Sequence, residues 1–264
     1  MNHKVKFLIL RLAPKPVRSR IMSKHYRHEI EQTGEAELPL LRDLVRPGDL
    51  TIDIGANLGV YAYELARLTG RVLAFEPNPD LAKLLKAVRP RGAAIYQVAL
   101  SDTDGEAELL VPTGHGAHGI ATLRRESDLG DAVERVSVPT RRLDTYKLHG
   151  VRFIKIDVEG FEEQVLEGAA ETIARDHPIL LVEIEERHNP GGLGRIRDRL
   201  RAAGYRGLYY RGGEWQPLDR FDPEVHQRAD GDVLEIGKTL TRRSADYINN
   251  FLFVPANDPR IGLN

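Results

Sequence analysis

Short apolar runs alternate along the chain with stretches whose apolar residues recur at helical spacing. Runs of this length between Gly, Pro, Asn or Asp residues are typical of buried strands, and the helical spacing predicts amphipathic helices between them. The predicted strands are Leu50–Ile54, Arg71–Phe75, Ala94–Val98, the stretch Phe153–Gly160, Ile179–Ile184, Tyr205–Tyr210 and Tyr247–Val254. The predicted helices are Glu35–Val45, one between Gly59 and Gly70, Pro79–Val88, one after Gly160, and Arg195–Ala203. This alternation predicts an α/β fold.

Two further strands, Glu106–Val111 and Arg135–Thr140, break the alternation and predict a small β insertion. They enclose a loop, Pro112–Asp131, in which His115 and His118 stand among three glycines. Imidazoles in such a loop are candidates for a base or for metal ligands. The alternative is a solvated loop without a chemical role.

The length and composition favour one enzyme-sized domain. At 264 residues the chain is long enough for a single α/β domain with a buried core, which we place at residues 35–264. The net charge of −1 gives no electrostatic reason to expect nucleic acid as a partner. Cysteine is absent, so disulfides and thiolate sites are excluded.

The first 34 residues form a basic arm of different composition, with no acid before Glu29. Its apolar run, Val5–Leu12, is interrupted by Lys6 and Arg11 and is too short to span a bilayer, and no small-residue cleavage site follows it. We therefore expect a cytoplasmic protein. The arm either contacts a membrane surface peripherally or packs on the domain.

A glycine turn follows the first predicted strand in the stretch TIDIGANLGVY. Gly55, Ala56, Asn57 and Gly59 form a strand-to-helix turn, which gives a ligand close approach to the backbone and to unpaired N–H groups. A dinucleotide site would need a third glycine and would not suit the carboxylate of Asp53, which repels phosphate. The pattern favours a cationic nucleoside without phosphate. An ordinary strand-to-helix turn is the alternative.

An acid, Glu76, ends the second strand about 20 residues after this turn, where α/β nucleoside sites place a carboxylate for the ribose hydroxyls. Pro77 and Asn78 follow it and belong to the same candidate cofactor site. The alternative for Glu76 is an acid that stabilises the next helix through its dipole. After the third strand, Ser101 or Asp102 is positioned either to contact the adenine base or to form a turn.

Charged residues also alternate in the stretch KIDVEG, where Lys155, Asp157 and Glu159 would share one side of a strand. Burying three charges is unfavourable unless they pair or reach a ligand cleft, and the carboxyl ends of parallel strands form such a cleft. A structural pair between Lys155 and Asp157 accounts for part of the pattern and leaves Glu159 unexplained.

Taken together, the motifs DIGANLGVY, FEPNP and KIDVEGFEEQVLEGA resemble those of the FkbM family of S-adenosylmethionine (SAM)-dependent methyltransferases. The resemblance extends from about Leu50 to Pro255 and includes the terminal NNFLFVP. It implies a Rossmann-like class I methyltransferase sheet, mostly parallel with an antiparallel last strand and with helices on both faces. It also implies methylation of a hydroxyl group on a sugar, glycolipid, polysaccharide or natural product. The acceptor itself is not carried over.

An alcohol acceptor must lose its proton as the new bond forms, so the site needs a base or a metal ion. The candidate bases at the carboxyl edge of the sheet are Asp157, Glu159, Glu185 and His188. Asp157, Glu183 or Glu185 with a loop histidine would instead suit Mg²⁺ or Mn²⁺. The metal-independent mechanism is favoured because no close-spaced ligand cluster is present.

The sequence is also compatible with two other classes of protein. A NAD-dependent oxidoreductase is disfavoured by the missing third glycine. A non-catalytic SAM-binding or scaffold protein is disfavoured by the carboxylates at the strand ends, which such a protein would not need. We expect a small-molecule or glycan acceptor as the partner.

Overall fold

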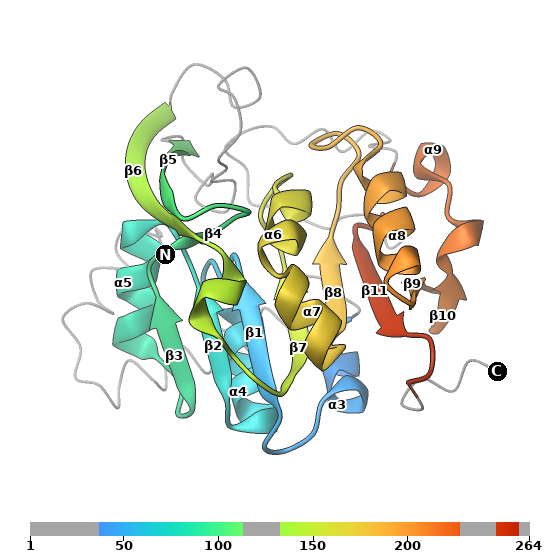
Figure 1. Ribbon diagram of the computed structural model, residues 1–264, viewed down its shortest axis with the longest axis horizontal. Helices are drawn as coiled ribbons and strands as arrows, with labels where there is room; N and C mark the ends of the chain where they lie inside the picture. Colours follow the sequence, from blue (N-terminus) through green and yellow to red (C-terminus); the bar gives the residue numbers. More distant parts are fainter. Residues whose placement is uncertain (1–36, 113–132, 228–246, 259–264) are drawn as a thin grey trace, which may run out of the picture.

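The computed structural model describes residues 37–112, 133–227 and 247–258. Their core is an eight-stranded sheet with the order β10-β9-β11-β8-β7-β1-β2-β3 (Figure 1). The strands are β1 (Leu50–Ile54), β2 (Val72–Phe75), β3 (Ala93–Tyr96), β7 (Val151–Ile156), β8 (Ile179–Glu183), β9 (Tyr205–Arg211), β10 (Glu214–Pro217) and β11 (Asn250–Pro255). All five residues of β1 are buried, as expected for a central strand covered on both faces.

The strand directions confirm the predicted class I methyltransferase architecture. Strands β8, β7, β1, β2 and β3 run parallel to one another. The last strand, β11, lies antiparallel between β8 and β9, and β10 closes the sheet as a hairpin with β9. Because the parallel strands share one direction, their carboxyl ends form a single edge of the sheet.

Helices cover both faces of the sheet, as predicted. The 3₁₀ helix η1 (Leu38–Leu40) continues into α3 (Leu41–Leu44), which packs with α4 (Val60–Thr69) on the face that carries Phe153 and Leu181. The face that carries Ile52 and Ile154 packs against α6 (Glu162–Gly168), α7 (Ala170–Asp176) and α8 (Gly192–Ala202) (Figure 1). The other helices within the described residues are α5 (Pro79–Val88), α9 (Pro223–His226), and the 3₁₀ helices η3 (Leu143–Tyr146) and η4 (Leu218–Arg220).

The predicted β insertion is a second sheet with the order β4-β6-β5. Strands β5 (Gly105–Pro112) and β6 (Val133–Arg141) form a long antiparallel pair, and the short β4 (Ala99–Leu100) adds parallel to β6. The loop with His115 and His118 lies outside the described residues, as does the basic arm of residues 1–34.

Several element ends differ from the prediction. Strand β7 stops at Ile156, because the backbone at Glu159 and Gly160 is left-handed, with φ of 50° and 98°, and turns the chain into α6. Strand β3 ends at Tyr96, since the chain then crosses to the second sheet. The first helix is short, and Pro39 stands in its 3₁₀ turn. Among the described residues, no helix is both long enough and apolar enough to cross a membrane.

Candidate active site

One pocket lies at the carboxyl edge of the parallel strands, and it joins the three sequence motifs. The glycine turn after β1, the end of β2 and the turn after β7 all contribute to its wall. The second sheet closes one side through β4 and Leu109 of β5. The lining residues are Ile54, Gly55, Asn57, Phe75, Glu76, Pro77, Leu81, Val98, Ala99, Leu100, Leu109, Asp157, Val158, Glu159 and Phe161.

The expectation that the glycine turn presents unpaired N–H groups is wrong for its first three residues. The N–H groups of Gly55 and Ala56 both donate to the carbonyl of Phe75, at N···O distances of 2.9 and 3.0 Å. The N–H of Asn57 donates to Oε2 of Glu76 at 2.7 Å. These bonds join the turn after β1 to the end of β2. The N–H groups therefore hold the pocket wall together and are already paired within the protein.

Gly55 is needed because another backbone segment approaches it closely. Its φ is +77°, and a Cβ placed on it would lie 1.7 Å from the carbonyl oxygen of Asp157. The N–H of Asp157 in turn donates to the carbonyl of Ile54 at 2.9 Å. The glycine turn and the KIDVEG stretch therefore interlock through their backbones. Gly59 has a φ of +85° and forms the N-cap of α4.

Glu76 is buried at the position predicted for the ribose acid. Its Oε2 accepts from Asn57 N–H, and its Oε1 accepts from Asn78 N–H at 2.8 Å. Burial raises the pKa of Glu76 to about 7, and the two backbone hydrogen bonds oppose this rise. The carboxylate lines the pocket and holds the backbone at Asn57 and Asn78, so it is suited to bind hydroxyl groups there.

The other predicted cofactor residues have different positions. Pro77 lines the pocket, whereas the side chain of Asn78 caps α5 by accepting from the N–H groups of Asp80 and Leu81. Ser101 donates from Oγ to Oδ1 of Asp102 at 3.0 Å, and the pocket wall is formed by the three residues before it. A contact of Ser101 or Asp102 with the base therefore stays a prediction.

Asp53 and Ala56 are buried, and neither is among the residues that line the pocket. Asp53 is buried within β1 and pairs in register with Lys155 of β7, so the two side chains share the α4 face of the sheet. The predicted alternation of charges on one strand is thus only partly correct. Lys155 is inside the strand, while Asp157 and Glu159 lie beyond its end at the pocket wall.

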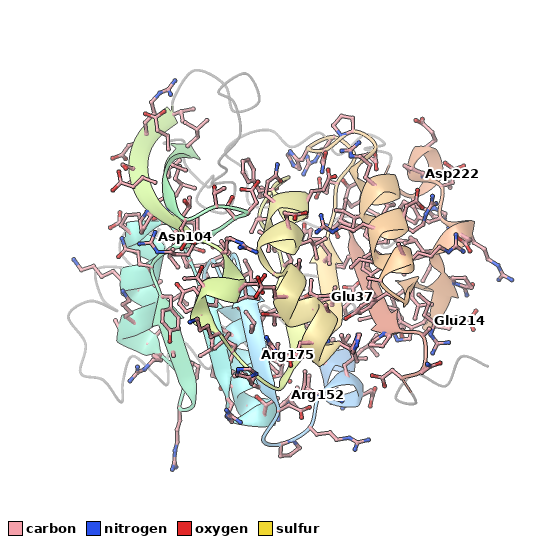
Figure 2. All side chains as sticks on the ribbon, in the orientation of Figure 1. Glu37, Asp104, Arg152, Arg175, Glu214 and Asp222 are labelled. Carbon is pink, nitrogen blue, oxygen red and sulfur yellow. The ribbon has the colours of Figure 1, made fainter. Side chains whose placement is uncertain are left out.

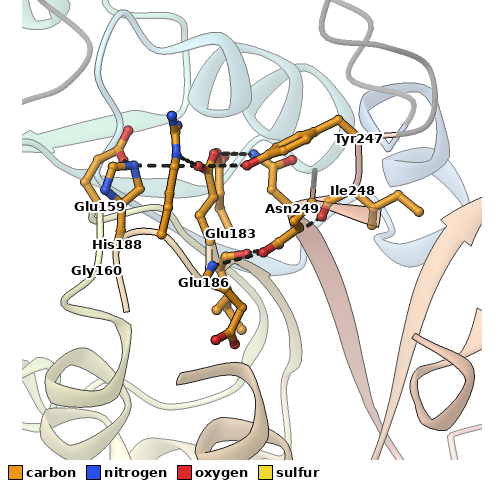
Figure 3. A network of polar contacts seen from close by, with 12 residues as sticks. Glu159, Gly160, Glu183, Glu186, His188, Tyr247, Ile248 and Asn249 are labelled. Atoms are coloured by element: carbon orange, nitrogen blue, oxygen red, sulfur yellow. Dashed lines mark hydrogen bonds and ion pairs between the residues drawn. The ribbon is translucent and has the colours of Figure 1, made fainter. Parts of the chain in front are cut away.

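A polar network extends from the pocket wall toward β11 (Figure 3). Nε2 of His188 lies 3.4 Å from Oε2 of Glu159 and 3.6 Å from Oε2 of Glu185. Glu185 is buried and accepts hydrogen bonds from three further side chains. These donors are Arg187 through Nε, Tyr247 through its hydroxyl at 3.0 Å and Asn249 through Nδ2 at 3.2 Å.

The four predicted bases differ in exposure and in the groups that they contact. The side chains of His188 and Glu159 are 23% and 22% exposed, and that of Glu185 is 3% exposed. Glu185 is therefore held in place as an acceptor, and His188 contacts both it and the pocket residue Glu159. Asp157 lines the pocket directly.

Tyr247, Asn249 and Asn250 also contribute to the site, and none of them was predicted to do so from the sequence. Asn250 begins β11, and the other two lie just before it. Asn249 donates to both Glu183 and Glu185, and Asn250 contacts Lys155. The only available signal was the pair of asparagines before the apolar run FLFVP. Buried asparagines at a strand start suggest polar partners on the neighbouring strand.

No group of three or more His, Cys, Asp or Glu residues arranged to hold a metal ion occurs within residues 37–112, 133–227 and 247–258. The candidate ligands His115 and His118 are outside these ranges. Charged groups such as Arg152 and Arg175 lie at the amino ends of the parallel strands, away from the pocket (Figure 2). Arg152 and Arg175 are therefore not part of the acidic pocket wall.

Known proteins with similar sequences support one reaction class. A family model described as "Methyltransferase FkbM domain" matches residues 53–206, more than half of the chain. The 31-O-demethyl-FK506 methyltransferase FkbM of Streptomyces tacrolimicus is 31% identical to this chain. That alignment covers 70% of this chain and 81% of the relative.

Two solved structures named as methyltransferases also align with most of this chain. The methyltransferase FkbM from Methylobacillus flagellatus KT aligns with 78% of this chain at 15% identity and a TM-score of 0.49, and this chain spans 43% of its length. A precorrin-6y C5,15-methyltransferase from Geobacter metallireducens GS-15 aligns with 83% of this chain and 88% of its own, at 12% identity and a TM-score of 0.45. Similarity at these levels carries no information about the acceptor.

Proposed function

The chain belongs to the FkbM family of methyltransferases, and on that basis we propose that it uses SAM to methylate a hydroxyl group. The proposed acceptor is a small molecule or a glycan: a sugar, a glycolipid, a polysaccharide or a natural product. The Streptomyces tacrolimicus relative is named as a methyltransferase of 31-O-demethyl-FK506, which fits this class of reaction.

The charge of the pocket wall is the observation that supports SAM as the cofactor. The described lining residues include three acids, Glu76, Asp157 and Glu159, and no Lys, Arg or His. A wall of this charge suits a sulfonium cation and disfavours a pyrophosphate. The residues present thus fit SAM better than NAD.

Two of these acids, Glu76 and Asp157, have a proposed part in holding the cofactor. Glu76 would accept from the ribose hydroxyls, since its carboxylate lines the pocket next to the glycine turn. Gly55 and Asn57 would contact the cofactor through the turn, and Asp157, whose carbonyl lies against Gly55, would face it beside the turn. When bound, SAM supplies an electrophilic methyl group on its sulfonium.

His188 is the proposed general base, and Glu185 the residue that positions it. Nε2 of His188 faces the carboxylates of Glu159 and Glu185, which would orient the ring, so Nδ1 is the nitrogen that would take the proton. Glu185 is already an acceptor for Arg187, Tyr247 and Asn249, so it is placed to fix the imidazole. Glu159, at the pocket wall, would orient the acceptor hydroxyl.

Binding and transfer are tested separately. We expect S-adenosylhomocysteine (SAH) to bind the native chain in a calorimetric titration, whereas NADH does not. We then expect a labelled methyl group to pass from SAM to at least one member of a panel of glycans and natural products, followed by intact mass. If the native chain binds neither SAM nor SAH, the proposal is ruled out.

The base assignment has its own variant and control. We expect His188→Ala to lower the single-turnover rate by roughly 10²- to 10⁴-fold, since this is the usual contribution of a positioned base. SAH affinity should be retained. His149→Ala is the matched control, because His149 is exposed in the turn before β7 and is outside the pocket. Equal rates for the native chain and His188→Ala would assign the base to another residue.

A further inference from the structure

A lysine with almost no exposed surface lies directly beneath the pocket. Lys155 is buried in β7, where an ammonium is unfavourable unless nearby groups compensate its charge. Its Nζ donates to Oδ1 of Asn250 at 3.0 Å and contacts the carbonyl of Ile156 at 3.5 Å. It also lies 5.0 Å from the centroid of the Tyr61 ring, a cation–π distance.

The same ammonium lies between two acids at the carboxyl ends of neighbouring strands. Nζ of Lys155 is 3.6 Å from Oε2 of Glu183, at the end of β8, and 3.9 Å from Oδ2 of Asp157, just after β7. The side chain of Asp157 is 32% exposed and lines the pocket, whereas that of Lys155 is 1% exposed. Lys155 thus connects the buried interior with the pocket wall.

We propose that Lys155 is a positioning residue of the cofactor pocket, whose ammonium fixes the carboxylate of Asp157 at the pocket wall. The inference rests on the proposed function, because it takes the pocket to be the SAM site. Lys155 itself does not line that pocket. In this proposal the ammonium of Lys155 takes the place between Asp157 and Glu183 that a divalent cation bridging the two acids would need.

The backbone contacts of Asp157 explain why its side chain needs this partner. Its N–H is held by the Ile54 carbonyl, and its own carbonyl lies against Gly55, so the main chain has little freedom. Only the side-chain carboxylate of Asp157 can still change its orientation. With a neutral residue at position 155, Asp157 and Glu183 would repel each other, and Asp157 would turn toward solvent and change the pocket wall.

A double-mutant cycle of Lys155→Met and Asp157→Asn tests this assignment. Met preserves much of the length of the side chain and removes its charge. We expect each single variant to weaken SAH binding by about tenfold and the double variant by about tenfold as well, because Lys155 acts through Asp157. Calorimetry measures all four affinities. The native and Lys155→Met chains should also keep their SAH affinities when EDTA is added.

Asp144→Asn is the control for a general loss of stability. Asp144 is a buried carboxylate that accepts from the N–H groups of Glu171 and Thr172 outside the pocket. We expect this variant to lower the thermal midpoint while SAH affinity stays unchanged. Should Lys155→Met not fold, Lys155→Gln replaces it in the cycle, since Gln removes the charge and keeps a donor for Asn250.

The outcomes separate the two proposals. An unchanged affinity of Lys155→Met, or losses that multiply to about a hundredfold in the double variant, would overturn the role of Lys155. SAH affinity that falls on adding EDTA would show that a metal ion, and not the lysine, holds the acids. A native chain that binds no SAH would instead overturn the proposed function.

Discussion

Glu76 combines a structural and a ligand-binding task in one buried side chain. Its two oxygens accept from the N–H groups of Asn57 and Asn78, and the same side chain lines the pocket. The position of this acid was predictable from its spacing after the glycine turn. Its bond to Asn57 was not, because spacing along the chain does not reveal which N–H groups the fold has already used.

The raised pKa of Glu76 leads to a prediction about stability. Its pKa is about 7 in the folded chain, against an ordinary value of 4.5. Between these values the folded chain holds a proton that the unfolded chain releases, so the contribution of Glu76 to the free energy of unfolding decreases as pH rises. The difference corresponds to about 3 kcal/mol between pH 4 and pH 8. Urea unfolding at several pH values measures it.

Glu76→Gln is the reference for this measurement, because the amide does not titrate. The native chain should lose stability relative to Glu76→Gln as pH rises through 7, and the two curves should differ most in slope between pH 4.5 and pH 7. Parallel curves over this range would contradict the prediction. The comparison cancels the titration of the other acids, which both chains share.

At the scale of the elements, the alternation of strands and helices was predictable and the strand ends were not. The apolar runs place β1, β2 and β7 correctly, since burial on both faces requires continuous apolar residues. The end of β7 at Ile156 depends on a left-handed turn at Glu159 and Gly160. The close approach of Gly55 to Asp157 arises from the pairing of β1 with β7, which a local pattern does not specify.

This contact predicts different effects for two glycine substitutions. Gly55 and Gly70 have similar φ values, +77° and +74°, so alanine incurs the same left-handed strain at both. A Cβ at Gly70 has no atom within 4 Å, whereas at Gly55 it meets the Asp157 carbonyl at 1.7 Å. We expect Gly70→Ala to lose about 1 kcal/mol of stability and Gly55→Ala roughly 3 kcal/mol or more.

Urea unfolding of the two variants beside the native chain provides the comparison. Because the backbone strain is shared, the difference between the variants isolates the steric contact between the glycine turn and the KIDVEG stretch. Gly55→Ala should also weaken SAH binding, since Asp157 lines the pocket, and Gly70→Ala should not. Equal losses of stability would show that Asp157 moves aside without resistance.

At the scale of the whole molecule, the last strand completes both the sheet and the site. Strand β11 comes at the end of the described chain and yet lies in the interior of the sheet, between β8 and β9. It brings Asn250 to Lys155, and the residues just before it bring Tyr247 and Asn249 to Glu185. The strand and its apolar character were predictable, but its neighbours were not, because strand order depends on contacts between distant segments.

This topology predicts that the chain does not fold without β11. A chain ending after Asp246 loses four side chains that are at most 1% exposed, Phe251, Leu252, Phe253 and Val254. Burial of each such side chain contributes about 1.5–3 kcal/mol, and the sum is comparable to the whole stability of a typical domain, about 5–15 kcal/mol. Strands β8 and β9 also lose their shared hydrogen-bonding partner. We therefore expect no cooperative unfolding transition by circular dichroism.

A chain ending after Asp258 is the matched control, because it retains β11 and the contacts of Tyr247, Asn249 and Asn250. We expect it to unfold cooperatively and to bind SAH with the affinity of the full chain. If the chain ending after Asp246 also unfolded cooperatively, β8 and β9 would be able to pair without β11, and the interior position of the strand would not be required for folding. If that shorter chain folded and still bound SAH, the polar network of Glu185 and Lys155 would be dispensable for the cofactor, which would confine its part to the acceptor side of the reaction.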